Sequence, residues 1–169
     1  MKKQNNLKIL ERKDINDAKW DQCISNSINC RHQALTWHLD IVSPGWKGII
    51  YGDYEAVMPY PLMYKYGIPV IIQPVFCQQL GIFSHGNLDK SVIVNFYRYL
   101  QRLFPVQYNV NSSYFSFEYA ELKFHMLPNI ELNLNLSYPE LFNNYSKNTK
   151  RNLRKAQRIN GAIERKKTY

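Results

Sequence analysis

Lysine and arginine side chains concentrate near the C-terminal end of the sequence, in a pattern that could bind phosphate groups. Residues 147–167 contain nine Lys or Arg residues and a single acid, Glu164. Side chains three and four positions apart share one face of a helix. Six basic residues follow or flank this spacing: Lys147, Lys150, Arg151, Arg154, Lys155 and Arg158. Such a face attracts phosphates by counterion release, and arginine adds bidentate hydrogen bonds. A solvated helix face without a ligand is the alternative.

The other residue types that carry chemistry form no complete catalytic or metal-binding pattern. The four histidines lack the HExxH spacing, and the three cysteines contain no CxxC pair. Glu55, Glu118 and the other carboxylates of predicted strands form no evident pair for acid–base catalysis. Cys77 has no basic neighbour in the sequence that would activate its thiol. The glycine-rich phosphate loops GxGxxG and GxxxxGK[ST] do not occur.

Length and composition favour a globular chain with a basic segment. At 169 residues it is expected to form one domain, or one large domain with a tail. The net charge of +9 favours phosphate-bearing or acidic partners. The N-terminus lacks the apolar region of a signal peptide, and no apolar run approaches the roughly 18 residues of a membrane helix. The odd cysteine count argues against a disulfide framework, so we expect a cytoplasmic, reduced protein.

Residues 46–84 are expected to form the sheet around which the chain is organised. This stretch is rich in Ile, Val, Tyr and Phe, which suit a half-buried strand. Gly52-Asp53 predicts a two-residue type II′ turn, and the alternate prolines Pro59 and Pro61 predict an edge or a bulge. The expected strands are 49–51, 54–62, 68–72 and 79–83.

Helices and further strands are expected on both sides of this stretch. The predicted helices are 15–24 with Asp14 as N-cap, 33–42, 88–104 stopped by Pro105, one that starts at 138, and 147–160 with Ser146 as N-cap and Gly161 after it. The predicted strands are 8–10, 106–110, 114–119, 130–136 and one that starts at 162. Residues 130–136 show the strictest alternation of apolar and polar side chains.

Several motifs resemble a known family. They are Tyr51–Pro59 (YGDYEAVMP), Lys65–Gly67 (KYG), Gln73-Pro74, Gln78–Phe83 (QQLGIF), Tyr145–Asn148 (YSKN) and Arg151–Ala156 (RNLRKA). The first four resemble the N-terminal half of bacterial GNAT-like proteins related to the FemAB peptidyltransferases. The last two resemble the segment near the junction of their two halves, so the resemblance covers nearly the whole chain.

This resemblance implies an α+β fold, with a mixed, mostly antiparallel sheet flanked by helices in a GNAT-like (acyl-CoA N-acyltransferase-like) lobe. It implies an N-terminal lobe over residues 1–145, and over 146–169 a basic helix and the start of a strand that leads toward a second lobe. Such proteins transfer an acyl or aminoacyl group to an amine, and the second lobe binds most of the donor. The Q/RxxGxG/A pyrophosphate loop does not occur here. We therefore expect this chain alone to bind no cofactor, with acetyl-CoA or aminoacyl-tRNA as the donor of the full-length family.

The predicted function is that of the substrate-side lobe of such an N-acyltransferase. No catalytic residue can be assigned by motif, and no metal site is expected. The candidate substrate-binding residues are Trp37, Gln78, Lys150, Arg151, Arg154 and Lys155. The expected partners are a second GNAT-like lobe, a phosphate-bearing ligand or tRNA at the basic helix, and a second copy in a homodimer. Two alternatives stay open: a nucleic-acid-binding module that uses residues 147–158, and a non-catalytic interaction domain.

Overall fold

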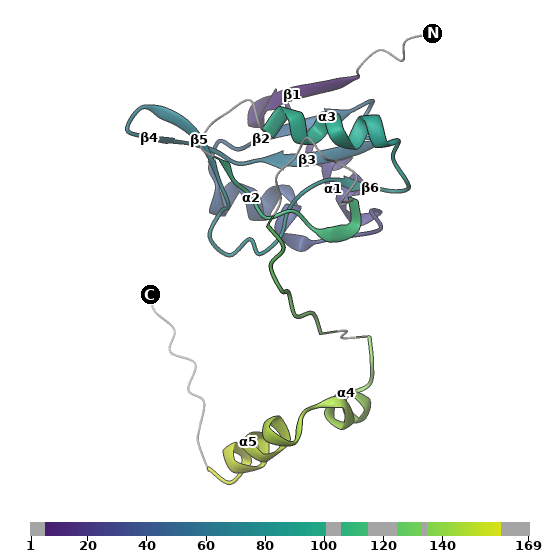
Figure 1. Cartoon of the computed structure of the whole chain (residues 1–169), viewed down its shortest axis with the longest axis vertical. Helices are drawn as coiled ribbons and strands as arrows, with labels where there is room; N and C mark the ends of the chain where they lie inside the picture. Colours follow the sequence, from purple (N-terminus) through teal and green to yellow (C-terminus); the bar gives the residue numbers. More distant parts are fainter. Residues whose placement is uncertain (1–5, 101–105, 115–124, 133–134, 160–169) are drawn as a thin grey trace. The chain divides into compact units, whose positions relative to one another are not determined.

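The structure, a computed structural model, describes residues 6–100, 106–114, 125–132 and 135–159. It divides into two compact units, residues 1–123 and residues 124–169. The first unit contains two sheets with helices beside them, and the second contains two helices (Figure 1). The expected α+β class with a mostly antiparallel sheet and flanking helices is confirmed. The division into a lobe of residues 1–145 and a junction of 146–169 stays a prediction.

The larger sheet is antiparallel throughout, with the strand order β1-β2-β3-β6. Its strands are β1 (Leu7–Glu11), β2 (Lys47–Tyr51), β3 (Ala56–Tyr60) and β6 (Phe83–Ser84). β3 is buried along its whole length because it lies between two strands and under helices. β6 pairs only with the first two residues of β3, so β3 has no strand neighbour on that side at Pro59. Proline, which has no amide N–H, is tolerated at such a position.

The smaller sheet has the order β4-β5-β7. Its strands are β4 (Leu62–Lys65), β5 (Ile68–Ile72) and β7 (Val106–Gln107), and β5 pairs with β7 in parallel. β3 and β4 are consecutive in the chain but belong to different sheets, so residues 46–84 do not form the single sheet that was expected. Pro61 separates the two strands. The missing N–H of proline ends one hydrogen-bonding ladder and lets the next begin.

The turn between β2 and β3 is wider than the sequence predicted. Tyr51 pairs with Ala56, so four residues rather than two form the connection. Gly52 and Tyr54 both have positive φ, 60° and 66°. The Tyr54 hydroxyl accepts a hydrogen bond from the Asn16 N–H at 2.8 Å, and this contact with the helical layer holds the wider turn. The two-residue turn of the first unit lies instead at Tyr66-Gly67, between β4 and β5.

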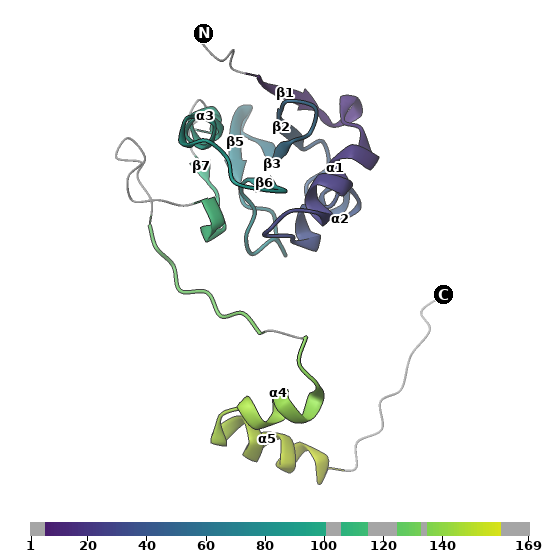
Figure 2. The ribbon, with the colours of Figure 1, turned by 90° about the vertical axis from the view of Figure 1, so that its right-hand side faces the viewer.

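Helices α1 (Asp17–Ser25) and α2 (Thr36–Val42) cover one side of the sheets, and α3 (Lys90–Leu100) covers the other (Figure 2). The N-cap of α1 is Asn16, whose Oδ1 accepts from the Lys19 N–H at 3.0 Å. The prediction of Asp14 as the cap is wrong, because this residue belongs to the preceding 3-10 turn η1 (Arg12–Asp14). The apolar residues of α3 are buried as predicted, whereas Pro105 lies outside the described residues.

The helix predicted over 33–42 is two shorter pieces, η2 (His32–Ala34) and α2. Leu35 between them is extended, with φ −69° and ψ 149°. The Asp21 carboxylate of α1 accepts from the Thr36 N–H and hydroxyl, both at 2.8 Å. A side chain from a neighbouring helix therefore caps α2 and fixes where it begins.

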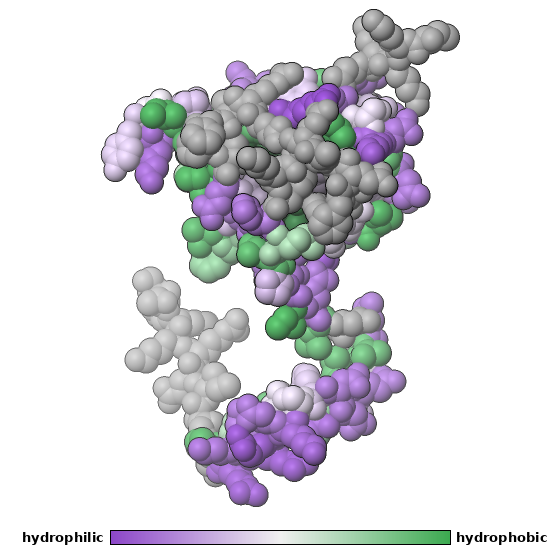
Figure 3. Space-filling view, viewed as in Figure 1, coloured by the Kyte–Doolittle hydropathy of each residue, from purple (hydrophilic) through white to green (hydrophobic). Residues whose placement is uncertain are grey.

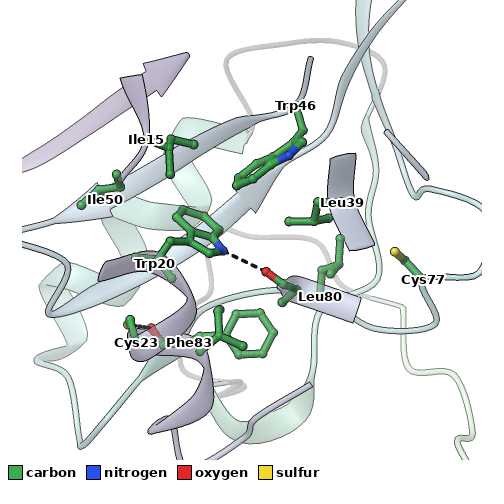
Figure 4. Close-up of a cluster of buried hydrophobic side chains, with 12 residues drawn as sticks. Ile15, Trp20, Cys23, Leu39, Trp46, Ile50, Cys77, Leu80 and Phe83 are labelled. Carbon is green, nitrogen blue, oxygen red and sulfur yellow. Dashed lines mark hydrogen bonds between the residues drawn. The ribbon is translucent and has the colours of Figure 1, made fainter. Parts of the chain in front are cut away.

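A cluster of buried side chains joins α1, α2 and the larger sheet (Figure 4). The Trp20 and Trp46 rings, both fully buried, lie 4.8 Å apart between centroids. The indole N–H of Trp20 donates to the Ala34 carbonyl at 2.9 Å. Gly48 of β2 faces the same ring, and a Cβ atom there would lie 2.5 Å from the Trp20 ring. The glycine therefore leaves the space that the indole occupies.

Five further strand predictions have different outcomes. Over 79–83 the prediction is wrong, because Leu80 forms an isolated parallel bridge with Val110 and only Phe83 begins a strand. Over 130–136 the described residues form no strand, and Ile130 is 96% exposed. The strand over 106–110 is confirmed for β7. The predicted strands over 114–119 and from 162 lie almost wholly or wholly outside the described residues, and Tyr114 belongs to the 3-10 turn η3 (Ser112–Tyr114).

Substituting Gly48 by alanine should destabilise the first unit. The new methyl group would meet the Trp20 ring and Ile15 Cδ1 at 2.5 and 3.0 Å. Overpacking of this kind costs about 1–3 kcal/mol in unfolding free energy, measurable by urea denaturation. The matched control is Gly86→Ala, because an added Cβ there meets nothing within 4 Å. Equal midpoints for both variants would contradict the close packing of Trp20 on Gly48.

Candidate anion-binding site

The second unit is built from α4 (Tyr138–Asn144) and α5 (Lys147–Gln157). Pro139 lies in the first turn of α4, and the Glu140 carboxylate accepts from the Ser137 hydroxyl at 2.6 Å and from the Ser137 N–H at 2.9 Å. These hydrogen bonds, the one from the hydroxyl foremost, lower the pKa of Glu140. The Glu140 carboxylate therefore caps the start of α4.

Helix α5 begins where the sequence predicted. The Ser146 hydroxyl accepts from the Thr149 N–H at 3.1 Å, so the predicted N-cap is confirmed. The helix ends at Gln157 with Arg158 as C-cap, before the predicted end at Asn160. Asn160 and Gly161 lie outside the described residues.

One of the predicted binding residues, Lys150, holds α5 against α4 instead of facing the basic hollow. Its ammonium donates to the Asn143 carbonyl at 2.9 Å and lies 5.7 Å from the centroid of the Phe142 ring. The Phe142 ring also lies 6.1 Å from the Tyr138 ring and 6.2 Å from the Tyr145 ring. Lys150 therefore orients the helix that carries the remaining cations.

The other basic side chains of α5 surround a surface hollow of about 500 Å³. It is lined by Lys147, Arg151, Arg154, Lys155 and Arg158. Three of these, Arg151, Arg154 and Lys155, were predicted as binding residues, and the other two belong to the predicted basic face. Figure 3 shows strongly hydrophilic side chains along this helix. All five residues are exposed, so an incoming ligand can reach them.

The five residues that line this hollow have no carboxylate partner among the described residues. By contrast, Arg12, Lys19 and Lys47 of the first unit each form an ion pair with a carboxylate. In α5, Arg151 donates to the neutral amide oxygen of Asn148 at 2.6 Å. Positive charge therefore faces positive charge along the helix. Each like-charge pair three or four positions apart destabilises a helix by about 0.2–0.5 kcal/mol.

This arrangement suits an anion with several charged oxygens. A bound anion would remove the repulsion between neighbouring cations and accept hydrogen bonds from them. Arginine forks match phosphate and carboxylate oxygens in pairs, whereas lysine acts as a point charge. The hollow contains neither a nucleophile nor an acid–base pair, so the geometry supports binding and orientation rather than bond breaking.

The structure places the other two predicted binding residues in the first unit. Trp37 lies on α2 with 55% of its surface exposed, and its ring meets the His38 ring edge-on at 5.3 Å. Gln78 is exposed, and its carbonyl accepts from the Asn109 side-chain amide at 3.4 Å. Neither residue lines the basic hollow of α5 or a second hollow in the first unit. Their role in binding stays a prediction.

Cysteine and metal chemistry receive no support from the described residues. Burial raises the pKa of Cys23 and of Cys77 to about 11, so both thiols are protonated at neutral pH. Within the described ranges, no group of three His, Cys, Asp or Glu residues could hold a metal ion. The helices of the described residues include none that is long and apolar enough to cross a membrane.

A second hollow, of about 420 Å³, lies in the first unit and was not predicted from the sequence. Its polar lining comes from α1, the β2–β3 turn and the residue after β6: Lys19, Gln22, Asn26, Asp53, Tyr54, Glu55 and His85. The available signal was the helical spacing of Lys19, Gln22 and the C-cap residue Asn26 along one exposed face of α1. The fold alone brings the other residues beside that face.

Neutralising Arg154 should strengthen α5 at low salt. Arg154→Gln removes the like-charge pairs that Arg154 forms with Lys150, Arg151 and Arg158. Each such pair lowers helix stability by about 0.2–0.5 kcal/mol. The ¹³Cα chemical shifts of residues 147–157 should become more helical, and sodium sulfate should produce a similar change in the wild type. Asn152→Gln, on the same helix without a charge change, is the control. An Arg154→Gln helix that is no more ordered than wild type at low salt would contradict the repulsion.

Similarity to known proteins adds no assignment to this geometry. Neither the family models, nor the curated proteins, nor the solved structures contain a match to this chain. The resemblance to FemAB-related proteins therefore rests on the short sequence motifs alone. It stays a prediction.

Proposed function

We propose that this chain is the substrate-side lobe of a FemAB-related, GNAT-like N-acyltransferase, and that α5 is its binding surface for a phosphate-bearing ligand. The observation that carries the binding role is the hollow lined by five cations that have no carboxylate partner among the described residues. The sequence motifs and the mostly antiparallel sheet with flanking helices support the acyltransferase class. Aminoacyl-tRNA, one of the two donor classes of the resembled family, carries a continuous row of phosphates.

The length of the basic face suits several successive phosphates. Lys147 and Arg158 are eleven positions apart, which at about 1.5 Å per residue is roughly 16 Å along the helix. A nucleic-acid backbone presents several charges over this distance. The cations of α5 would therefore hold a strand or duplex backbone with little dependence on base sequence, because phosphate contacts carry no sequence information.

In this proposal the cations of α5 divide into those that bind the ligand and one that positions the helix. Arg151 and Arg154 form paired hydrogen bonds with phosphate oxygens, and Lys147 and Lys155 add charge around them. Lys150 keeps α5 on α4 through its bond to the Asn143 carbonyl. In the resembled family most of the acyl donor is bound by the second lobe. Acyl transfer is therefore proposed for this lobe acting together with a donor-binding one.

Unacylated tRNA should bind the full chain with an affinity that falls steeply with salt. Each phosphate contact contributes about 0.7–0.9 to the slope of log K against log salt. The double variant Arg151→Gln/Arg154→Gln should therefore bind more weakly, with a slope smaller by about 1.4–1.8, as measured by fluorescence anisotropy. The matched control, Lys13→Gln/Lys65→Gln, removes two exposed charges from the first unit. An equal loss in both double variants would show that net charge, rather than α5, binds the tRNA.

A second candidate is a stand-alone nucleic-acid-binding module with no part in acyl transfer. The exposure of every cation that lines the α5 hollow favours it, because a solvent-facing basic helix binds any phosphate backbone without needing another lobe. Under this function duplex DNA and tRNA of equal length should bind alike at one salt concentration. Under the first function, binding of tRNA should exceed that of duplex DNA.

Acetyl-CoA should not bind strongly to this chain alone. The sequence lacks the pyrophosphate loop of an acetyl-CoA site, and the resembled family binds its donor mainly through the second lobe. Isothermal titration should therefore give no micromolar dissociation constant for acetyl-CoA. Tripolyphosphate serves as a control for simple attraction between α5 and phosphate groups. Micromolar acetyl-CoA binding that survives Arg151→Gln/Arg154→Gln would contradict the assignment of this chain as the substrate side.

A further inference from the structure

The hollow of the first unit includes carboxylates in its lining, whereas the hollow of α5 is lined by Lys and Arg alone. One wall is the exposed face of α1 and its C-cap, which present Lys19, Gln22 and the C-cap residue Asn26 at positions i, i+3 and i+7. The other wall is the β2–β3 turn, which contributes Asp53, Tyr54 and Glu55, and His85 lies beside them after β6. Segments distant in the sequence therefore meet around a space of about 420 Å³.

An ion pair fixes one end of this hollow. The Lys19 ammonium donates to both Asp53 carboxylate oxygens, at 2.7 and 2.8 Å, and lies 6.0 Å from the centroid of the Tyr54 ring. The bond from Lys19 lowers the pKa of Asp53. The charges of Lys19 and Asp53 thus neutralise each other, and Glu55 carries the remaining unneutralised charge among the lining residues.

The turn itself is held in a strained form that displays Glu55. Tyr54 has a φ of 66°, which is unfavourable for a bulky residue, and its hydroxyl is fixed by the Asn16 N–H at 2.8 Å. The Glu55 carboxylate folds over Gly52, where an added Cβ would lie 2.8 Å from both its Cδ and its Oε1. No described residue donates a hydrogen bond to this carboxylate, so its oxygens are available to a ligand.

His85 adds a second acceptor with a defined orientation. Its Nδ1 lies 2.9 Å from the Asn26 carbonyl oxygen, which can only accept, so Nδ1 carries the proton. In the tautomer with the proton on Nδ1, Nε2 bears a lone pair and can accept a hydrogen bond. The side-chain amides of Gln22 and Asn26, both exposed, line the same hollow and can supply carbonyl oxygens.

We propose that this hollow binds a primary ammonium group, with the Glu55 carboxylate as counter-ion and His85 Nε2 and the amide oxygens as hydrogen-bond acceptors. An ammonium has three N–H donors and one positive charge, which match several acceptors and one unpaired carboxylate. The site stands on its own geometry, whether or not α5 binds a phosphate-bearing ligand. An acyl acceptor with a free amine is one molecule of this class.

The probe for this site is n-propylammonium, titrated into the full chain and followed by ¹H–¹⁵N correlation spectra. The backbone resonances of residues 22, 26, 53–55 and 85 should shift together and saturate at millimolar concentrations. Tetramethylammonium, which has the same charge without N–H donors, should shift them far less. Propionate tests whether the response needs a cation. Equal shifts with tetramethylammonium, or no saturating shift with propylammonium, would overturn the proposal.

The decisive variant is Glu55→Gln, which removes the charge and keeps the size of the side chain. Losing a charge-assisted hydrogen bond should weaken propylammonium binding about tenfold. Asp14→Asn removes one exposed carboxylate outside the hollow and should leave the affinity unchanged. If the resonances of a variant outside the hollow match those of the wild type, that variant is folded. Undiminished binding in a folded Glu55→Gln variant would refute the role of Glu55, and tRNA binding by that variant reports separately on α5.

Discussion

The burial of the Trp20 indole is the constraint on which the first unit depends. The ring is fully buried, donates its N–H to the Ala34 carbonyl, and occupies the space left by Gly48. One side chain of α1 therefore fixes the distance to β2 and anchors the segment that leads into α2. Removing its hydrogen-bond partner or filling its space would disturb several elements, because close-packed interiors relax only in part.

A second network extends this packing to the surface. The Trp46 ring lies against Trp20, and its N–H donates to the Asp40 carboxylate at 2.9 Å. Arg12 binds the same carboxylate and also Asp17, and its guanidinium lies 5.5 Å from the centroid of the Trp46 ring. This bond from Arg12 is the main reason that the pKa of Asp40 is lowered. Acidification below the ordinary range of aspartate removes the Asp40 charge and with it the stabilisation that the ion pair supplies.

The two candidate binding surfaces arise from different levels of structure. The basic hollow is a property of one helix, so the spacing of Lys147, Arg151 and Arg154 was enough to predict the basic face that lines it. The ammonium hollow requires α1, a strained turn and His85 to meet, and each of these segments looks ordinary in the sequence. Contacts separate from the burial of Trp20 hold α1 beside the turn, since Asn16 and Lys19 bind Tyr54 and Asp53.

The sequence by itself determined the elements whose signals are local. Hydrophobic spacing predicted α3, the Ser146 hydroxyl predicted the start of α5, and β-rich composition predicted β2, β3 and β5. Tertiary structure decided the rest. It widened the β2–β3 turn through Tyr54 and divided the expected helix over 33–42, because contacts from α1 compete with local preferences. It also left Ile130 and Leu132 out of any strand, since alternation forms a strand only where a neighbouring strand accepts its hydrogen bonds.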